Sequence, residues 1–167
     1  MKKLFAWGLA ALLLMGVLVA CGGGNGAAAG TGSSADYKVV LEAARPESAE
    51  NIPVITSPEE DGPTGLLDFF GVPQEDMKKY AISVSLINVK AYGIAIILPQ
   101  EGKEQAVTDA VNAFVELQQK GFENYLQDQY AIAKGALVKT APTGEVILVM
   151  CEDAATVMAA IEKGLAA

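Results

Sequence analysis

Two cysteines, Cys21 and Cys151, are the side chains of this 167-residue sequence best suited to covalent chemistry. A thiol can be acylated, can pair with a second thiol or can act as a nucleophile. The sequence contains no histidine, which excludes Ser-His-Asp and Cys-His nucleophile systems and most catalytic zinc sites. Cys151 ends the apolar run VILVMC, where a lone thiol is typical of a small core residue. We therefore expect chemistry at Cys21 and packing at Cys151, with no disulfide between them.

The residues before Cys21 indicate what its thiol would react with. Lys2 and Lys3 precede residues 4–20, which carry no charge, a pattern typical of an export signal or a short membrane span. The stretch Leu18-Val19-Ala20-Cys21 resembles the lipobox of bacterial lipoproteins. This resemblance implies that a diacylglycerol is attached to the Cys21 thiol and that the chain is cut before this residue.

An uncleaved N-terminal transmembrane helix is the alternative for residues 1–20. The glycines that follow Cys21 argue against a helix that continues there, and both alternatives place the rest of the chain outside the cytoplasm. Residues 22–35 are almost all Gly, Ala, Ser, Thr and Asn, which cannot bury enough surface to fold, so they predict a tether. The predicted organisation is a lipoprotein signal peptide at 1–20, the lipidated cysteine with its tether at 21–35 and a single domain at 36–167.

The charge balance of the chain restricts its partners. Without Lys2 and Lys3, ten basic side chains stand against twenty acidic ones. A surface with this balance repels phosphate groups, so we expect no nucleic-acid partner. Contact with an anionic membrane must then come from the lipid on Cys21, and the expected location is the extracytoplasmic face of the cell membrane.

Three polar stretches were weighed as sites, and none predicts one. The run Glu59-Glu60-Asp61 is interpreted as a solvated charge run, because adjacent carboxylates point in different directions and cannot share a cation. Glu152 and Asp153 are typical of a turn and a helix cap. Gly102-Lys103 lacks the preceding glycine of a phosphate-binding loop. We expect no catalytic residue, cofactor or metal.

The spacing of apolar residues in the domain predicts short helices and then two units of two strands and a helix. Short helices are expected at 36–45 and 66–70, around a proline-rich loop. A strand at 80–87 alternates, with Tyr80, Ile82, Val84 and Leu86 on one face and Ala81, Ser83 and Ser85 on the other. The elements expected after it are a strand at 93–98, a helix at 101–128, a hairpin of strands at 135–140 and 145–151, and a final helix that Asp153 caps.

This ββαββα order predicts an α+β fold, an antiparallel sheet with helices mainly on one face and short N-terminal helices before it. Leu117 and Tyr125 of the long helix are expected to point toward the core. The sheet face that carries Ala81, Ser83 and Ser85 is expected to be open or covered only by loops.

Several segments together resemble a known family. The stretches LLDFFGVPQEDMKKYAISVS, IAIIL, QQKGFENY and ALVKTAPTGEVILVMCED are similar in pattern and spacing to the DUF4358 domain of Gram-positive lipoproteins, over roughly residues 37–165. The resemblance implies export, lipidation and a common fold. It implies no reaction.

Two functions of different class fit these features. The first is a non-enzymatic module, anchored to the membrane through Cys21, that binds an envelope protein or a wall component. The alternative is a small-ligand-binding lipoprotein, although 147 mature residues leave little room for two lobes around a cleft. An enzyme is the third possibility and would need carboxylates or tyrosines brought together from distant segments. A pocket of convergent polar groups would favour a ligand-binding protein or an enzyme over an interaction module.

Overall fold

A computed structural model describes residues 30–167, and the secondary structure in it follows the predicted order. The N-terminal part holds α1 (Tyr37–Ala44), α2 (Pro58–Asp61) and α3 (Leu66–Phe70), with short 3₁₀ turns at Glu47–Ala49, Gly62–Thr64 and Gln74–Asp76. After these come β1 (Met77–Val84), β2 (Gly93–Pro99), α4 (Glu104–Phe122), α5 (Gln127–Lys134), β3 (Leu137–Thr140), β4 (Val146–Met150) and α6 (Ala154–Leu165).

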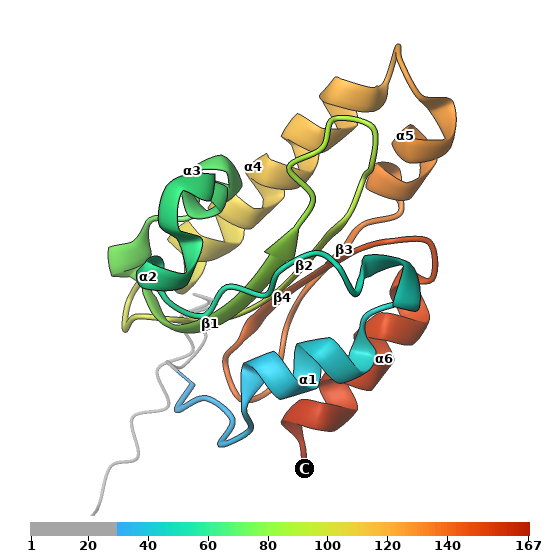
Figure 1. Cartoon of the computed structure of the whole chain (residues 1–167). Coiled ribbons are helices and arrows are strands. Elements are labelled where there is room, and N and C mark those ends of the chain that lie inside the picture. Colours follow the sequence, from blue (N-terminus) through green and yellow to red (C-terminus); the bar gives the residue numbers. More distant parts are fainter. Residues whose placement is uncertain (1–29) are drawn as a thin grey trace, which may run out of the picture.

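The four strands form one antiparallel sheet in the order β1-β2-β4-β3 (Figure 1). The two central strands, β2 and β4, are buried at every position. Their sequences, GIAIILP and VILVM, are apolar on both faces, so both faces of the sheet must be covered to remove them from water. The predicted α+β class and antiparallel sheet are confirmed.

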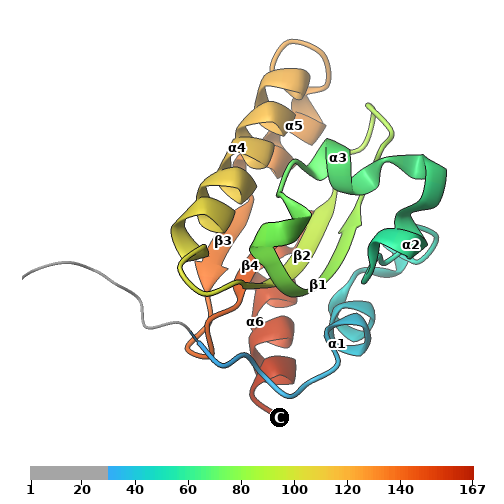
Figure 2. The same cartoon turned by 90° about the vertical axis from the view of Figure 1, so that its left-hand side faces the viewer.

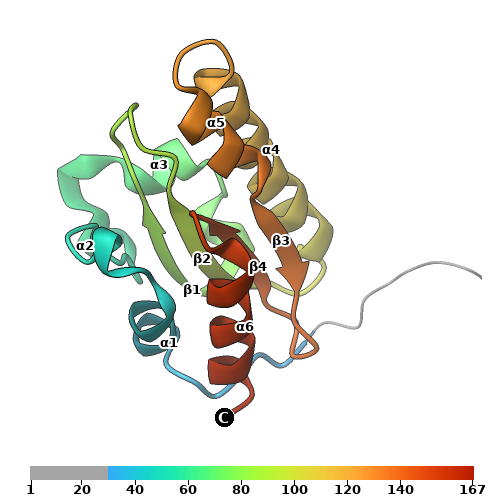
Figure 3. The same cartoon turned by 90° about the vertical axis from the view of Figure 1, so that its right-hand side faces the viewer.

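Helices cover both faces of this sheet, which corrects the expectation that they lie mainly on one. One apolar cluster joins Ile82, Ala95 and Leu148 to side chains of α3, α4 and α5. A second cluster joins the alternate strand residues, such as Ile96 and Ile147, to α1 and α6. The sheet is therefore the middle of three layers (Figures 2 and 3).

The face that was expected to be open lies inside the second cluster. Ala81 and Ser83 have no exposed surface, because α1 and α6 pack over this side of the sheet. Ser85, which follows the end of β1, is also buried. The small side chains of β1 let these helices approach closely. The alternation along β1 was predicted correctly, but its second face packs against other parts of the protein and is not exposed to water.

The predicted helix at 101–128 is two helices. α4 ends at Phe122, and after a short turn α5 begins at Gln127 and packs back against α4, where the Gln119 amide donates a hydrogen bond to the Ala133 carbonyl at 3.2 Å. Tyr125, in the turn, is 62% exposed and does not point inward.

Residues 30–35 contact the domain, although the sequence predicts a tether there. The Gly32 amide donates a hydrogen bond to the Thr143 carbonyl at 3.0 Å, in the turn between β3 and β4. Gly30 lies so close to this turn that a Cβ atom on it would be 2.0 Å from the Thr143 oxygen, so only glycine fits. The contacts of the domain therefore extend at least six residues before the predicted boundary at Asp36.

Candidate functional site

The proposed lipidation site lies outside the described residues. Leu18, Val19, Ala20 and Cys21 precede residue 30, where the structure begins to be described. The prediction of a lipid on Cys21 therefore stays a prediction.

Cys151 is a buried packing residue, as expected. It follows β4 within the second apolar cluster, and its thiol is free. Burial raises the pKa of this thiol, and the neighbouring carboxylates of Asp153 and Glu152 add to the effect. A thiol with a raised pKa is a poor nucleophile at neutral pH.

A hollow of about 390 Å³ lies beside Cys151, and two of its polar side chains have partners within the domain. The Lys90 ammonium donates to the Ser48 carbonyl at 2.7 Å, and the Gln129 side-chain oxygen accepts from the Ala91 amide at 2.8 Å. The carboxylates of Glu152 and Asp153 also line this hollow, so its polar groups are engaged only in part.

The acidic run has two roles. Glu59 and Glu60 are exposed, as predicted, but the expectation of a solvated charge is wrong for Asp61, which is buried. Its carboxylate accepts hydrogen bonds from the Leu66 amide at 2.8 Å and the Leu67 amide at 3.1 Å, at the start of α3. Within residues 30–167 no group of three His, Cys, Asp or Glu side chains could hold a metal ion.

The other polar candidates also have structural partners. The Lys103 ammonium lies 2.8 Å from the Asp76 carboxylate and forms an ion pair with it, while Gly102 adopts a turn with a φ of 77°. Asp153 stands directly before α6, but its side chain makes no capping hydrogen bond, which corrects that expectation.

Glu145 is a buried carboxylate that the sequence analysis missed. It has no exposed surface, and it accepts hydrogen bonds from the Tyr37 hydroxyl at 2.6 Å, the Ser33 amide at 2.5 Å and the Thr143 hydroxyl. Burial alone would raise the pKa of Glu145, but these hydrogen bonds outweigh burial and hold the pKa below its usual value. Burial also raises the pKa of Tyr37, and its bond to Glu145 raises it further.

This network fastens residues 30–35 to the domain. The Ser33 hydroxyl donates to the Leu165 carbonyl at 2.5 Å, and the Lys79 ammonium donates to the Ala35 carbonyl at 2.6 Å. The Lys79 ammonium also lies 3.9 Å from the centre of the Tyr37 ring. Because Glu145 is shielded from solvent, it cannot exchange protons with a substrate, and its role is structural.

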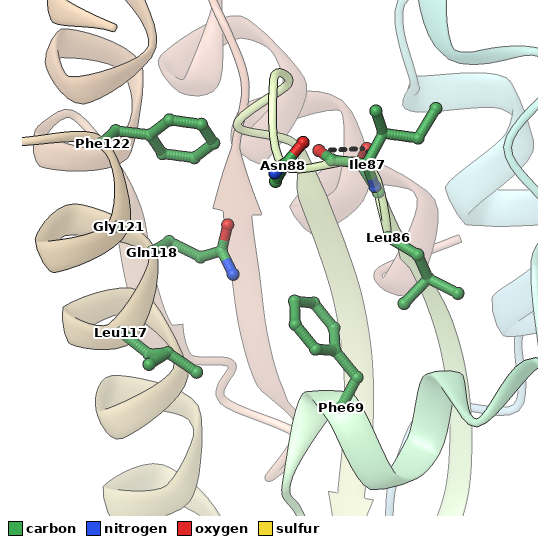
Figure 4. A pocket seen from close by; sticks show the side chains of 9 residues that line it. Phe69, Leu86, Ile87, Asn88, Leu117, Gln118, Gly121 and Phe122 are labelled. Atoms are coloured by element: carbon green, nitrogen blue, oxygen red, sulfur yellow. Dashed lines mark hydrogen bonds between the residues drawn. The ribbon is translucent and has the colours of Figure 1, made fainter. Parts of the chain in front are cut away.

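A groove of about 250 Å³ is the feature best suited to bind a partner (Figure 4). It lies between α3, α4 and the loop that joins β1 to β2. The residues that line it are Phe69, Ser85, Leu86, Ile87, Asn88, Leu117, Gln118, Gly121 and Phe122. None of them carries a charge, so the groove is apolar with a few amide and hydroxyl groups.

The loop wall of this groove is shaped by Ser85. Its hydroxyl accepts a hydrogen bond from the Ile87 amide at 3.2 Å and donates one to the Ile87 carbonyl at 3.4 Å, which turns the chain just after β1. The turn leaves Leu86 45% and Ile87 64% exposed. Leu86 was predicted to continue the buried face of the strand, but β1 ends at Val84 and Leu86 points out.

Two other lining residues add exposed apolar surface to the groove. Leu117 of α4 is 54% exposed and Phe69 of α3 is 38% exposed. Leu117 was predicted to face the core, but it lies on the rim of the groove instead. Clustered exposed apolar residues of this kind mark interaction sites in soluble domains, whereas single ones need no explanation.

Gln118 places a polar group inside this apolar groove. Its side chain is only 9% exposed and points from α4 into the groove, and its amide makes no hydrogen bond with residues 30–167 (Figure 4). Gly121, one turn further along α4, has no atom within 4 Å of the place where a Cβ would be, so it leaves the groove open.

Comparison with protein families adds one assignment. The family model described as "Domain of unknown function (DUF4358)" matches residues 55–152. The chain belongs to the DUF4358 family. The DUF4358 match contains the whole sheet, α3 to α5 and every residue of the groove, whereas α1 and α6 lie outside it. No curated protein and no solved structure gives a significant match to this DUF4358 chain.

Among residues 30–167, no helix is long and apolar enough to cross a membrane.

Proposed function

We propose that the chain is a non-enzymatic interaction module of the cell envelope, anchored by a lipid on Cys21, that binds a partner protein through the groove between α3, α4 and the β1–β2 loop. The observation that carries the proposal is the group of exposed apolar side chains around this groove, among them Leu86, Ile87 and Leu117. A hydrophobic centre of this kind with a polar surround is typical of a protein docking site.

The position of the groove supports this proposal. The groove lies beside Gly93, at the start of β2, whereas Gly32 contacts the turn before β4, which pairs with the other end of β2. The seven residues of β2 separate these two ends by about 20 Å. From Cys21 to Gly30 the chain can span at most about 30 Å. A domain held this close to the membrane at one end would present the groove at the other end.

The alternative, a small-ligand-binding lipoprotein, has less support. A volume of about 250 Å³ is below the range of about 300–1,000 Å³ that is usual for small-molecule sites. In the larger hollow beside Cys151, the side chains of Lys90 and Gln129 are engaged within the domain. A groove that admits one or two side chains and is surrounded by exposed apolar residues suits a protein surface better.

Leu117→Glu is expected to weaken binding of the partner at least tenfold, because it puts a charge on the rim of an apolar groove. Leu117 is 54% exposed, so the free energy of unfolding should change by less than about 0.5 kcal/mol. Val39→Glu is the matched control, because Val39 is 60% exposed on α1, which covers the opposite face of the sheet.

The measurement is crosslinking on intact cells, followed by identification of the captured protein. One protein should be captured with the wild type and with Val39→Glu and be lost with Leu117→Glu. If Leu117→Glu captures the same protein as efficiently as the wild type, the groove is not the docking site.

Cys21→Ser is expected to block lipid attachment and leave the precursor uncut, because a hydroxyl does not replace the thiol in this acylation. Cells fed radiolabelled palmitate should label the wild-type protein and not the Cys21→Ser protein, whose apparent mass should stay that of the precursor. Label that still enters the Cys21→Ser protein would refute the lipid anchor.

A further inference from the structure

The Gln118 amide is a polar group that lines an otherwise largely apolar groove and has no hydrogen-bond partner within residues 30–167. Its carbonyl can accept two hydrogen bonds and its NH₂ can donate two, and it uses none of them within residues 30–167. When a partner covers the groove, water is removed from this amide, and an amide that is buried unpaired weakens binding. A well-matched partner must therefore bring both an apolar body and a hydrogen-bonding group to Gln118.

The walls of the groove restrict that partner further. Phe69 and Phe122 present aromatic rings and Leu117 presents aliphatic surface, while no lining residue is charged (Figure 4). An arginine, lysine or carboxylate that entered would lose its water and find no opposite charge. A leucine or phenylalanine would satisfy the walls but leave the Gln118 amide unpaired.

We infer that the groove receives a tyrosine or tryptophan side chain of the partner protein, with its hydroxyl or indole N–H bonded to the Gln118 amide. This inference rests on the proposed function. Both side chains have an apolar body and one polar tip, and both are the residues most often found at the energetic centre of protein interfaces. A space of about 250 Å³ accommodates one such side chain.

This chain itself offers two aromatic side chains as alternative occupants, of which the proposed maturation leaves one for the test to separate. The sequence has one tryptophan, Trp7, within the segment that the proposed maturation removes. Tyr125 is 62% exposed in the turn after α4, so the groove of one copy could receive Tyr125 of a second copy. A partner of this second kind would make the protein a dimer.

The test is selection of random peptides displayed on phage against the purified full chain, compared with Gln118→Met and Leu117→Glu. Methionine keeps the length of Gln118 and removes its hydrogen-bonding groups. Wild-type protein is expected to select peptides that share a tyrosine or tryptophan. Gln118→Met should instead select phenylalanine, leucine or methionine at that place, and Leu117→Glu should bind neither set.

A selected peptide then gives the quantitative result. Changing its tyrosine to phenylalanine should weaken binding to the wild type about tenfold and to Gln118→Met less than twofold. Equal losses on both proteins, or selection of phenylalanine and leucine by the wild type, would overturn the inference and leave the proposed function standing. Failure to select any peptide whose binding depends on Leu117 would overturn the proposed function as well. If sedimentation shows a dimer that Tyr125→Ser dissociates, the groove binds a second copy of this chain. That result would overturn the inference that a different protein supplies the side chain.

Discussion

Ser83→Lys is expected to prevent folding, at a cost of more than about 4 kcal/mol in the free energy of unfolding. Ser83 has no exposed surface and pairs with Ile94, which is also fully buried. The only polar group placed beside its hydroxyl within residues 30–167 is the Tyr92 hydroxyl, with which it forms no regular hydrogen bond, so an ammonium group in its place would find no opposite charge. Several kilocalories per mole for a buried unpaired charge consume most of the stability that a domain of this size has.

Urea unfolding followed by circular dichroism tests this expectation, with two control variants. Ser83→Ala should change the free energy of unfolding by less than about 1 kcal/mol, since it removes only a hydroxyl that makes no hydrogen bond. Leu86→Lys, at a position that is 45% exposed beyond the end of β1, should also be tolerated. If Ser83→Lys unfolds at nearly the same urea concentration as these controls, α1 and α6 do not cover this face.

The same serine shows how far the sequence predicts the fold. Alternation along β1 was predicted correctly, because a period of two is a local property of the chain. Whether Ala81 and Ser83 then face water or another layer is not local, and small residues occur in both settings. The deciding signal was present in β2 and β4, whose runs are apolar on both faces and require cover on both.

The ends of elements were harder to predict than the elements themselves. The apolar spacing continues through Leu117 and Tyr125, and it does not show that α4 stops at Phe122 or that α5 turns back. Leu86 continues the alternation of β1, but the hydrogen bonds between Ser85 and Ile87 end the strand first. The three side chains that were predicted to face the core, Leu86, Leu117 and Tyr125, are all exposed. Leu86 and Leu117 line the groove.

The groove itself could not be predicted from the sequence. Its lining comes from three segments, around Phe69, Leu86 and Gln118, that only the folded chain brings together. A glutamine on a helix is ordinary in a sequence, and only the folded chain shows that Gln118 is 9% exposed and lines a groove. Glu145 is similar, because in sequence it is one more polar residue of a hairpin, while its donors Ser33 and Tyr37 lie more than 100 residues away.

Glu145→Leu is expected to lower the free energy of unfolding by about 3–5 kcal/mol at pH 7, because it removes the shared acceptor of three donors, of which the Tyr37 hydroxyl is buried. Glu145→Gln should cost less, since its carbonyl can still accept. Tyr37→Phe should cost about 1–3 kcal/mol, because it removes one donor and leaves the carboxylate with Ser33 and Thr143. Urea unfolding at pH 7 measures all three values.

The pH dependence of stability separates the carboxylate from simple packing. The pKa of Glu145 is lower in the folded chain than its usual value of 4.5. The unfolded chain therefore binds the proton more readily, so the stability from Glu145 is complete above about pH 4.5 and is lost as the pH falls through the lower, folded value. Wild-type protein should lose more stability between pH 6 and pH 3 than Glu145→Gln. Equal losses of stability in the two proteins would show that protonation of Glu145 is not coupled to folding.

Loss of Glu145 should also release residues 30–35 before the rest of the domain unfolds. These residues are held by Glu145 through Ser33 and by the turn at Thr143, so limited proteolysis of Glu145→Leu should cut within 30–35 while α1 stays intact. Six released residues would lengthen the chain between Cys21 and the domain from at most about 30 Å to about 50 Å. The carboxylate that stabilises the fold would then also set how far the groove stands from the membrane. Crosslinking to the partner should therefore change with Glu145→Leu at a temperature where the domain remains folded. An unchanged crosslinking pattern would show that Glu145 stabilises the fold without setting the distance between the groove and the membrane.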